Sequence, residues 1–180
     1  MLTKADQMVE KQPENQAVVY EAMAESLGAT WKELNSQLQL RGNLLEDAVN
    51  FFNYVKKNQH QLEKLESFLR ALQSFGDANA VKDATDKHKE IKNDVLDTAV
   101  GAMTYGEKSI EKIREIGSKS DDLERVKEVY NACTKIEKVM INLDEKRKEL
   151  DQVWHEKKQT LDFKKQAAQI YKDLQTIEEW

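Results

Sequence analysis

Three histidines and one cysteine are the side chains of this sequence whose spacing is most informative about a metal site or catalysis. A di-iron helical bundle needs Glu-x-x-His pairs on facing helices, and no histidine here has an acidic residue three positions before it. The histidines, each with the residue three positions earlier, are His60 (Lys57), His88 (Thr85) and His155 (Gln152). A His-Glu-x-x-His motif, a phosphate-binding glycine loop and a cysteine pair are also missing. We therefore predict no catalytic residue, no metal site, no cofactor and no small-molecule substrate, which means that the protein is not an enzyme.

Structural roles account better for these four side chains. His88 and Cys133 both fall on apolar helical stripes, so we expect a partly buried structural histidine and a small core residue. His60 and His155 lie among charged residues and are expected to face water. A single cysteine allows no internal disulfide, which favours a reducing compartment such as the cytoplasm.

The charge pattern excludes several classes of partner. Charged residues make up 34% of the 180 residues, against about 25% in typical soluble domains, and the net charge is −5. Acidic and basic residues are interleaved even in the most basic stretch, which runs from Lys146 to Lys165. Nucleic-acid binding would require a basic stripe, and binding to anionic lipid would require a basic face. No apolar run approaches the roughly 18 residues of a membrane span, so neither nucleic acid nor membrane is favoured as a partner.

Apolar residues recur at steps of three and four along most of the chain, which is the period of helices packed in a coiled coil. Only Pro13 and six glycines could interrupt helices. We predict a first helix that begins after Pro13 and ends near Gly76, and a second that ends at Gly117. A third helix, with Ser120 as its N-cap, should continue to the end of the chain.

The aromatic residues of the first and third helices divide into two groups. Trp31 and Trp154 keep the apolar period and are predicted to pack in a core. Phe52 also lies on the predicted stripe, whereas Phe51 lies beside it and should be exposed or lie between units, where it could contact a partner. The predicted stripe of the first helix contains Leu27, Trp31, Leu34, Leu38, Leu45, Ala48, Phe52, Val55 and Leu62.

Two short loops between long amphipathic helices force the helices to lie antiparallel, as a left-handed three-helix bundle. This all-α arrangement divides the chain into a partial unit at residues 1–43, a complete bundle at 44–165 and the start of another unit at 166–180. Helices should run without a loop from one unit into the next. A continuous first helix of about 60 residues, at 1.5 Å each, would form a rod roughly 90 Å long.

An internal repeat supports this division. The stretch from Trp31 to Leu69 is similar to the stretch from Arg147 to the end at an offset of about 116 residues, a period that suits stacked helical units. Corresponding pairs at this offset are Arg41 with Lys157, Leu45 with Leu161 and Tyr54 with Ile170.

On these residues the chain resembles the spectrin repeat family over nearly all of its length. The Trp31-Lys32-Glu33-Leu34 segment with Arg41, Leu45 and Ala48 is similar to the third helix of such a repeat, and His88 to the histidine of its second helix. Trp180 is similar to the tryptophan of a following first helix. The segment from Leu150 to Asp162, including Trp154-His155, is similar to the Rho guanine-exchange scaffolds Trio and Kalirin. The complete repeat departs from the family in having no tryptophan near Lys64 and Leu65.

The resemblance implies a semi-rigid spacer and protein-docking surface within a larger cytoskeletal or Rho-signalling protein, located in the cytoplasm at the cytoskeleton or cell cortex. The alternative suggested by long amphipathic helices is a membrane-associated helical dimer of the BAR type. Partial bundles leave apolar stripes uncovered, so this chain could also self-associate through them.

Overall fold

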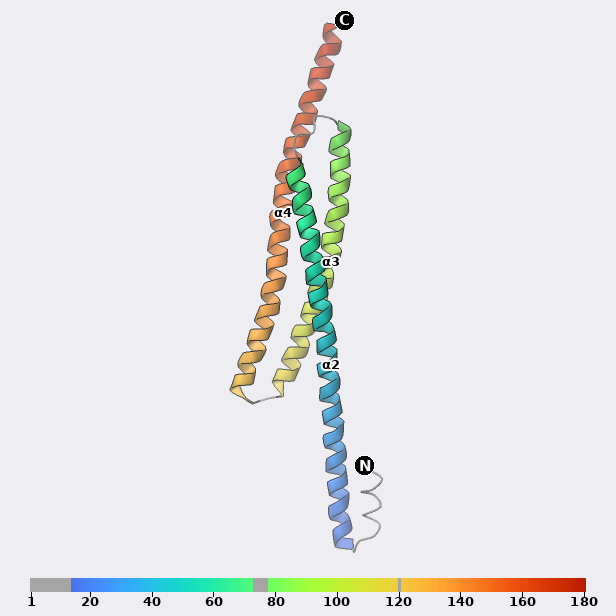
Figure 1. Ribbon diagram of the computed structural model, residues 1–180, viewed down its shortest axis with the longest axis vertical. Helices are drawn as coiled ribbons and strands as arrows, with labels where there is room; N and C mark the ends of the chain where they lie inside the picture. The colour runs from blue at the N-terminus through green and yellow to red at the C-terminus, as the bar shows by residue number, and fades with distance from the viewer. Residues whose placement is uncertain (1–13, 73–77, 120) are drawn as a thin grey trace.

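The computed structural model describes residues 14–72, 78–119 and 121–180, and they form three long helices (Figure 1). Helix α2 spans Glu14–Ala71, α3 spans Ala78–Ser118 and α4 spans Leu123–Glu178. No strand occurs in the described part of the chain. The predicted all-α, three-helix architecture is confirmed.

Helix α2 is unbroken through the region where two predicted units meet. Its 58 residues include Gly42 and Leu44, with no loop between Leu44 and Val55. At about 1.5 Å per residue the helix is about 87 Å long, close to the length expected from the sequence.

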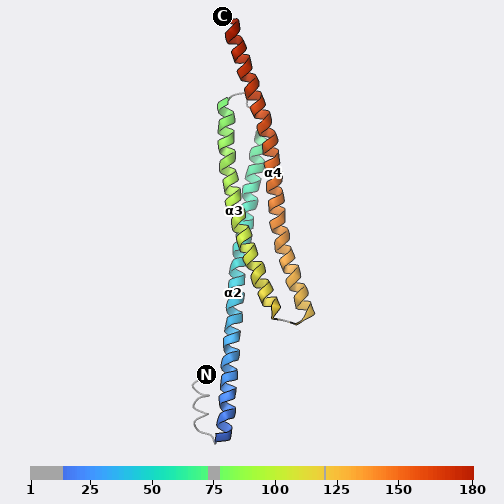
Figure 2. The same cartoon turned by 180° about the vertical axis from the view of Figure 1, so that it is seen from behind.

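The three helices overlap only in the middle of the molecule. Helix α3 runs back along α2 and packs against both neighbours, whereas the contact between α2 and α4 is smaller. Both views show α2 extending beyond one end of the bundle and α4 beyond the other (Figures 1 and 2). The leading part of α2 and the last part of α4 therefore project in opposite directions.

The hydrophobic core lies where all three helices overlap. It is built from the second half of α2, most of α3 and the middle of α4, because apolar residues on these segments face one another at helical spacing. Its largest fully buried apolar residues are Phe51, Leu65, Leu69, Ile91 and Val95. Cys133 is buried, as predicted for a small core residue.

Two glycines of α3 allow its neighbours to approach closely. A Cβ at Gly101 would collide with the ring of Tyr54. A Cβ at Gly106 would lie 2.6 Å from Sδ of Met140 and 3.1 Å from the ring of Phe51. The absence of side chains at these positions therefore sets how closely α3 packs against α2 and α4.

The start of α2, the end of α3 and the N-cap of α4 agree with prediction to within two residues, whereas α2 ends at Ala71, five residues before the predicted end at Gly76. Helix α3 continues past Gly117, which is buried; a Cβ there would lie 2.6 Å from a side-chain carbon of Val129, so α4 approaches α3 closely at this position. The N-cap of α4 is Asp122, whose side chain accepts a hydrogen bond from the backbone N–H of Glu124. The predicted cap residues Gly76 and Ser120 lie outside the described residues. Within the described helices, none is long and apolar enough to cross a lipid bilayer.

Candidate functional site

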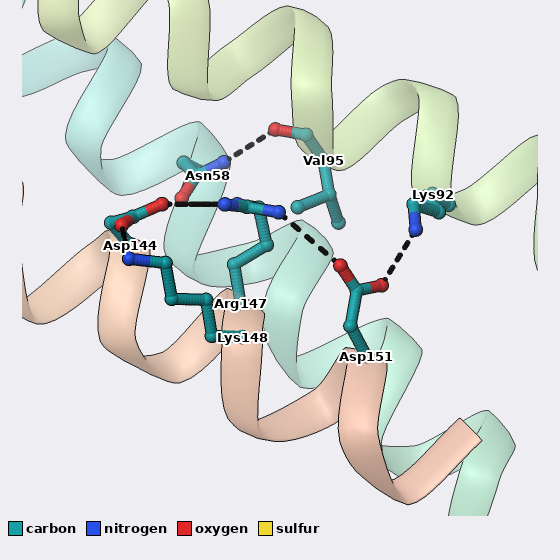
Figure 3. Close-up of polar contacts among 7 residues, drawn as sticks. All are labelled: Asn58, Lys92, Val95, Asp144, Arg147, Lys148 and Asp151. Atoms are coloured by element: carbon teal, nitrogen blue, oxygen red, sulfur yellow. Dashed lines mark hydrogen bonds and ion pairs between the residues drawn. The ribbon is translucent and has the colours of Figure 1, made fainter. Parts of the chain in front are cut away.

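The centre of the bundle contains one fully buried amide that ties α2 to α3 (Figure 3). Nδ2 of Asn58 donates to the backbone oxygen of Val95 at 2.7 Å and to Oγ1 of Thr98 at 2.9 Å. Its Oδ1 is buried without a hydrogen-bond partner. Because a buried amide is costly unless its partners are in place, Asn58 fixes the register of α2 on α3.

A chain of ion pairs links α3 to α4 beside this amide (Figure 3). Nζ of Lys92 lies 2.8 Å from Asp151, whose other oxygen lies 3.2 Å from Arg147. Arg147 and Lys148 both lie 2.7 Å from Asp144. Hydrogen bonds from Lys148 and Arg147 lower the pKa of the Asp144 carboxyl. Asp144 is thus held charged, and both carboxylates are paired with cations that tie α3 to α4 or stabilise α4 itself.

The same ion pairs occupy the most basic stretch of the sequence. Each of the three consecutive cations at 146–148 lies within 4 Å of a carboxylate oxygen. Lys146 pairs with Glu66 and Glu149, and the other two pair with Asp144. These cations therefore do not form a separate basic face for anionic lipid.

His88 is stacked on the ring of Trp154, at the opposite end of the core from Gly117. Its ring lies 3.8 Å from that of Trp154 at an interplanar angle of 7°, and Phe68 approaches both rings at 6.5 Å. The histidine is 4% exposed and its Nε2 has no hydrogen-bond partner. Burial, with a further contribution from Lys92, lowers the pKa of His88 to about 4. It is therefore a neutral, structural histidine, as predicted.

The remaining candidate ligands are not gathered into one place. His60 and His155 are exposed, in agreement with prediction. Among the described residues, no cluster of three or more His, Cys, Asp or Glu side chains could hold a metal ion.

The feature best suited to function is an apolar stripe along the leading half of α2. Its large side chains are 50–68% exposed, although their spacing is that of a coiled-coil seam. We call this set the α2 stripe: Leu27, Trp31, Leu34, Leu38, Leu45 and Phe52. Contiguous apolar surface of this kind is typical of sites that bind another protein segment.

The prediction for the two neighbouring phenylalanines was wrong. Phe51 is 1% exposed and packs in the core, whereas Phe52 is 61% exposed. The buried face of α2 uses Phe51, Val55, Asn58 and Leu62, which is one position out of phase with the stripe ending at Phe52. Of the predicted stripe, Val55 and Leu62 are therefore buried whereas Phe52 is not, so the buried face of α2 changes phase between Phe52 and Val55.

The prediction for the two tryptophans was half right. Trp154 is half-buried and packs against the core, as expected. Trp31 is 61% exposed, because no other described helix lies over that part of α2. Its apolar period was read correctly, but the period alone does not say where the covering helix comes from.

The projecting end of α4 carries a second uncovered set of apolar residues. Between half and all of the surface of each of these side chains is accessible to solvent. The members are Phe163, Ile170, Tyr171, Leu174, Ile177 and Trp180. Both projecting helices thus present apolar faces, at opposite ends of the bundle.

Sequence reasoning missed the ties made by Asn58 and by the pair of Lys112 with Asp47. Both Asn58 and Asp47 are buried on the face of α2 that contacts α3. Their signal in the sequence is polar residues at spacings that continue the buried face, 47, 51, 55 and 58. It was obscured by the competing α2 stripe.

Comparison with known proteins gives a family and two relatives. The model of a family described as a domain of unknown function, DUF7799, matches residues 52–163, which is more than half of the chain. Coiled-coil domain-containing protein 141 of Homo sapiens is 26% identical over 167 residues, covering 89% of this chain and 11% of that protein. The protein of the same name from Rattus norvegicus is 27% identical over 164 residues, with the same coverage. The chain thus spans about a tenth of the length of these relatives. No solved structure gives a significant match.

Proposed function

The chain belongs to the DUF7799 family, and we propose that it is a non-catalytic spacer and protein-docking segment within a longer helical protein. The observation that carries this proposal is the continuity of α2, which leaves the bundle without a break while still presenting the α2 stripe. A helix of this kind transmits distance and orientation and offers an apolar face to a neighbour.

The internal repeat indicates what kind of neighbour suits the stripe. At the offset of 116 residues, Leu27, Leu34 and Leu45 correspond to Leu143, Leu150 and Leu161. The first three are exposed on α2, whereas the last three are buried on α4 under the other helices of the bundle. The leading half of α2 thus has the side chains of a helix that belongs inside a bundle.

We therefore propose the division into a partial unit at 1–43, a complete unit at 44–165 and the start of a further unit at 166–180. In this scheme two antiparallel helices of a preceding unit cover the part of the α2 stripe from Leu27 to Leu38. The resemblance to spectrin repeats supports the scheme, since their third helix continues into the next repeat. It also suggests a cytoplasmic scaffold at the cytoskeleton or cell cortex, of the cytoskeletal or Rho-signalling kind. The relatives' name, which refers to a coiled coil, agrees with the helical character of the proposal.

Fluorescence of Trp31 tests whether a preceding unit covers the stripe. In a Trp154→Phe/Trp180→Phe background, Trp31 reports alone, and in the present chain it should emit like a solvent-exposed indole. Extending the chain at its N-terminus by the parent protein's preceding helical unit should shift the emission to shorter wavelength and reduce quenching by acrylamide, because the ring becomes buried.

The matched control keeps Trp180 as the single reporter, with Trp31 and Trp154 replaced by phenylalanine. Trp180 lies at the other end of the molecule, so the same extension should leave its emission unchanged. Unchanged emission and quenching of Trp31 in the extended protein would contradict the proposal.

A further inference from the structure

Gly42 is a helical glycine that packing does not require. A Cβ at Gly42 would have no neighbouring atom within 4 Å, whereas one at Gly101 or Gly106 would collide with side chains of other helices. Glycine weakens a helix interior relative to alanine because its backbone loses more freedom on folding. Gly42 also lies within two residues of the boundary at residue 44 between the proposed units, so it is a weak point at the junction.

Lys112 of α3 holds the helix just after this weak point. Its Nζ pairs with the carboxylate of Asp47 and donates to the backbone oxygen of Asn43 at 3.5 Å. The side chain of Asp47 is 10% exposed and that of Lys112 is 25% exposed. This pair is therefore shielded from salt more than a surface pair would be.

Lys119, near the end of α3, reaches the helix on the other side of Gly42. Its Nζ lies 3.7 Å from Oε1 of Glu33, and Gln37 donates to the same oxygen at 2.8 Å. Both partners of the ion pair are largely exposed. A cleft lined by Leu34, Leu38 and Ile116 lies beside them, and none of these three side chains belongs to the hydrophobic core.

We propose that Gly42 is a hinge between the bundle and the leading half of α2, and that Lys112 and Lys119 form an electrostatic brace that holds it straight. This inference rests on the proposed spacer function and adds a control of its stiffness. The buried pair of Lys112 with Asp47 should resist salt, whereas the exposed pair of Lys119 with Glu33 should be weakened by salt. High ionic strength should therefore loosen the junction without disrupting the bundle.

Distances between spin labels measure this directly. Labels at Ala29→Cys and Asn131→Cys are both on exposed positions, one before the hinge and one on the bundle. Cys133 is buried and a chain without added cysteines checks that it stays unlabelled. We expect a narrow distance distribution at low salt, a wider one for Lys119→Gln and the widest for Lys112→Gln/Lys119→Gln. Wild-type protein in about 1 M salt should resemble Lys119→Gln, since the screening length there is about 3 Å.

Two further variants make the test specific. Gly42→Ala in the double-lysine variant should narrow the distribution again, because it stiffens the helix without restoring the brace. Lys135→Gln removes an exposed lysine of α4 and should leave the distribution unchanged. Circular dichroism confirms that each variant is helical; should Lys112→Gln fail to fold, Lys119→Gln and Gly42→Ala provide the comparison.

Equal distributions in the wild type, Lys119→Gln, Gly42→Ala and high salt would overturn the hinge and its brace. That result is distinct from failure of the spacer function, in which the protein would be compact in solution at any ionic strength.

Discussion

The stacked His88 and Trp154 rings show how burial decides the state of a single residue. The pKa of His88 is lowered to about 4, from an ordinary value of 6.5, because its ring is buried and Lys92 is near. Because the pKa of His88 is lower in the folded state than in the unfolded state, protonation of the unfolded chain opposes folding, and folding is favoured while the histidine is neutral. Its contribution is fully present above pH 6.5 and is lost as the pH falls from 6.5 towards 4.

We therefore predict that His88→Phe makes the free energy of unfolding less dependent on pH in this window. Between pH 6.5 and 4, the free energy of unfolding of the wild-type protein should fall by up to about 3 kcal/mol more than that of the variant. The reason is that folding lowers the pKa of His88 from 6.5 to about 4. Urea unfolding at several pH values measures the difference, and His155→Phe, at an exposed position, serves as the control. Parallel curves for wild type and His88→Phe would show that His88 is not buried in the folded state.

Replacing either of two glycines by alanine should change the stability of the protein, with opposite signs at the two positions. Gly42→Ala should stabilise the protein by up to about 1 kcal/mol, because nothing lies near the new methyl group. Gly101→Ala should destabilise it by about 1–3 kcal/mol, because the methyl group collides with the ring of Tyr54. Denaturant midpoints compare the two, and equal effects of the same sign would mean that α3 does not approach α2 as closely as the structure shows.

At the scale of the helix, the continuity of α2 depends on residues near the junction. Ala48→Pro should cost about 3 kcal/mol or more, because proline removes a backbone hydrogen bond and clashes with the preceding turn. Ala48→Gly, which keeps the hydrogen bond, should cost only about 1 kcal/mol. Helicity by circular dichroism and the melting temperature distinguish them; an Ala48→Pro protein that melts like wild type would place residue 48 outside a helix.

The three helices were predictable because breakers are rare and the apolar period is strong. The start of α2 follows from Pro13, and the unbroken length of α4 follows from the absence of Gly and Pro after Gly117. The roles of Phe51, Phe52 and Trp31 were not predictable in the same way. Two apolar faces overlap on α2 between Leu45 and Phe52, and a single sequence does not say which of them its own bundle covers.

The polar ties were harder still to predict. Asn58 and Asp47 look like interruptions of an apolar pattern until the helix that supplies their partners is in place. Val95 and Lys112 are distant from them in sequence, so only the packing of α3 on α2 brings the groups together.

At the scale of the whole molecule, the two projecting helices determine the shape. Helix α2 leaves the bundle at one end and α4 at the other, so the chain is longer than the bundle (Figures 1 and 2). The proposed spacer function implies that such segments act in series within a longer rod.

Small-angle X-ray scattering of the 180-residue chain tests the central claim most directly. A rod about 90 Å long has a radius of gyration of about 26 Å, and the projecting helices should give at least this value at low protein concentration. A radius near 16 Å, which is expected for a compact domain of this length, would show that the chain folds back on itself and would contradict the spacer account.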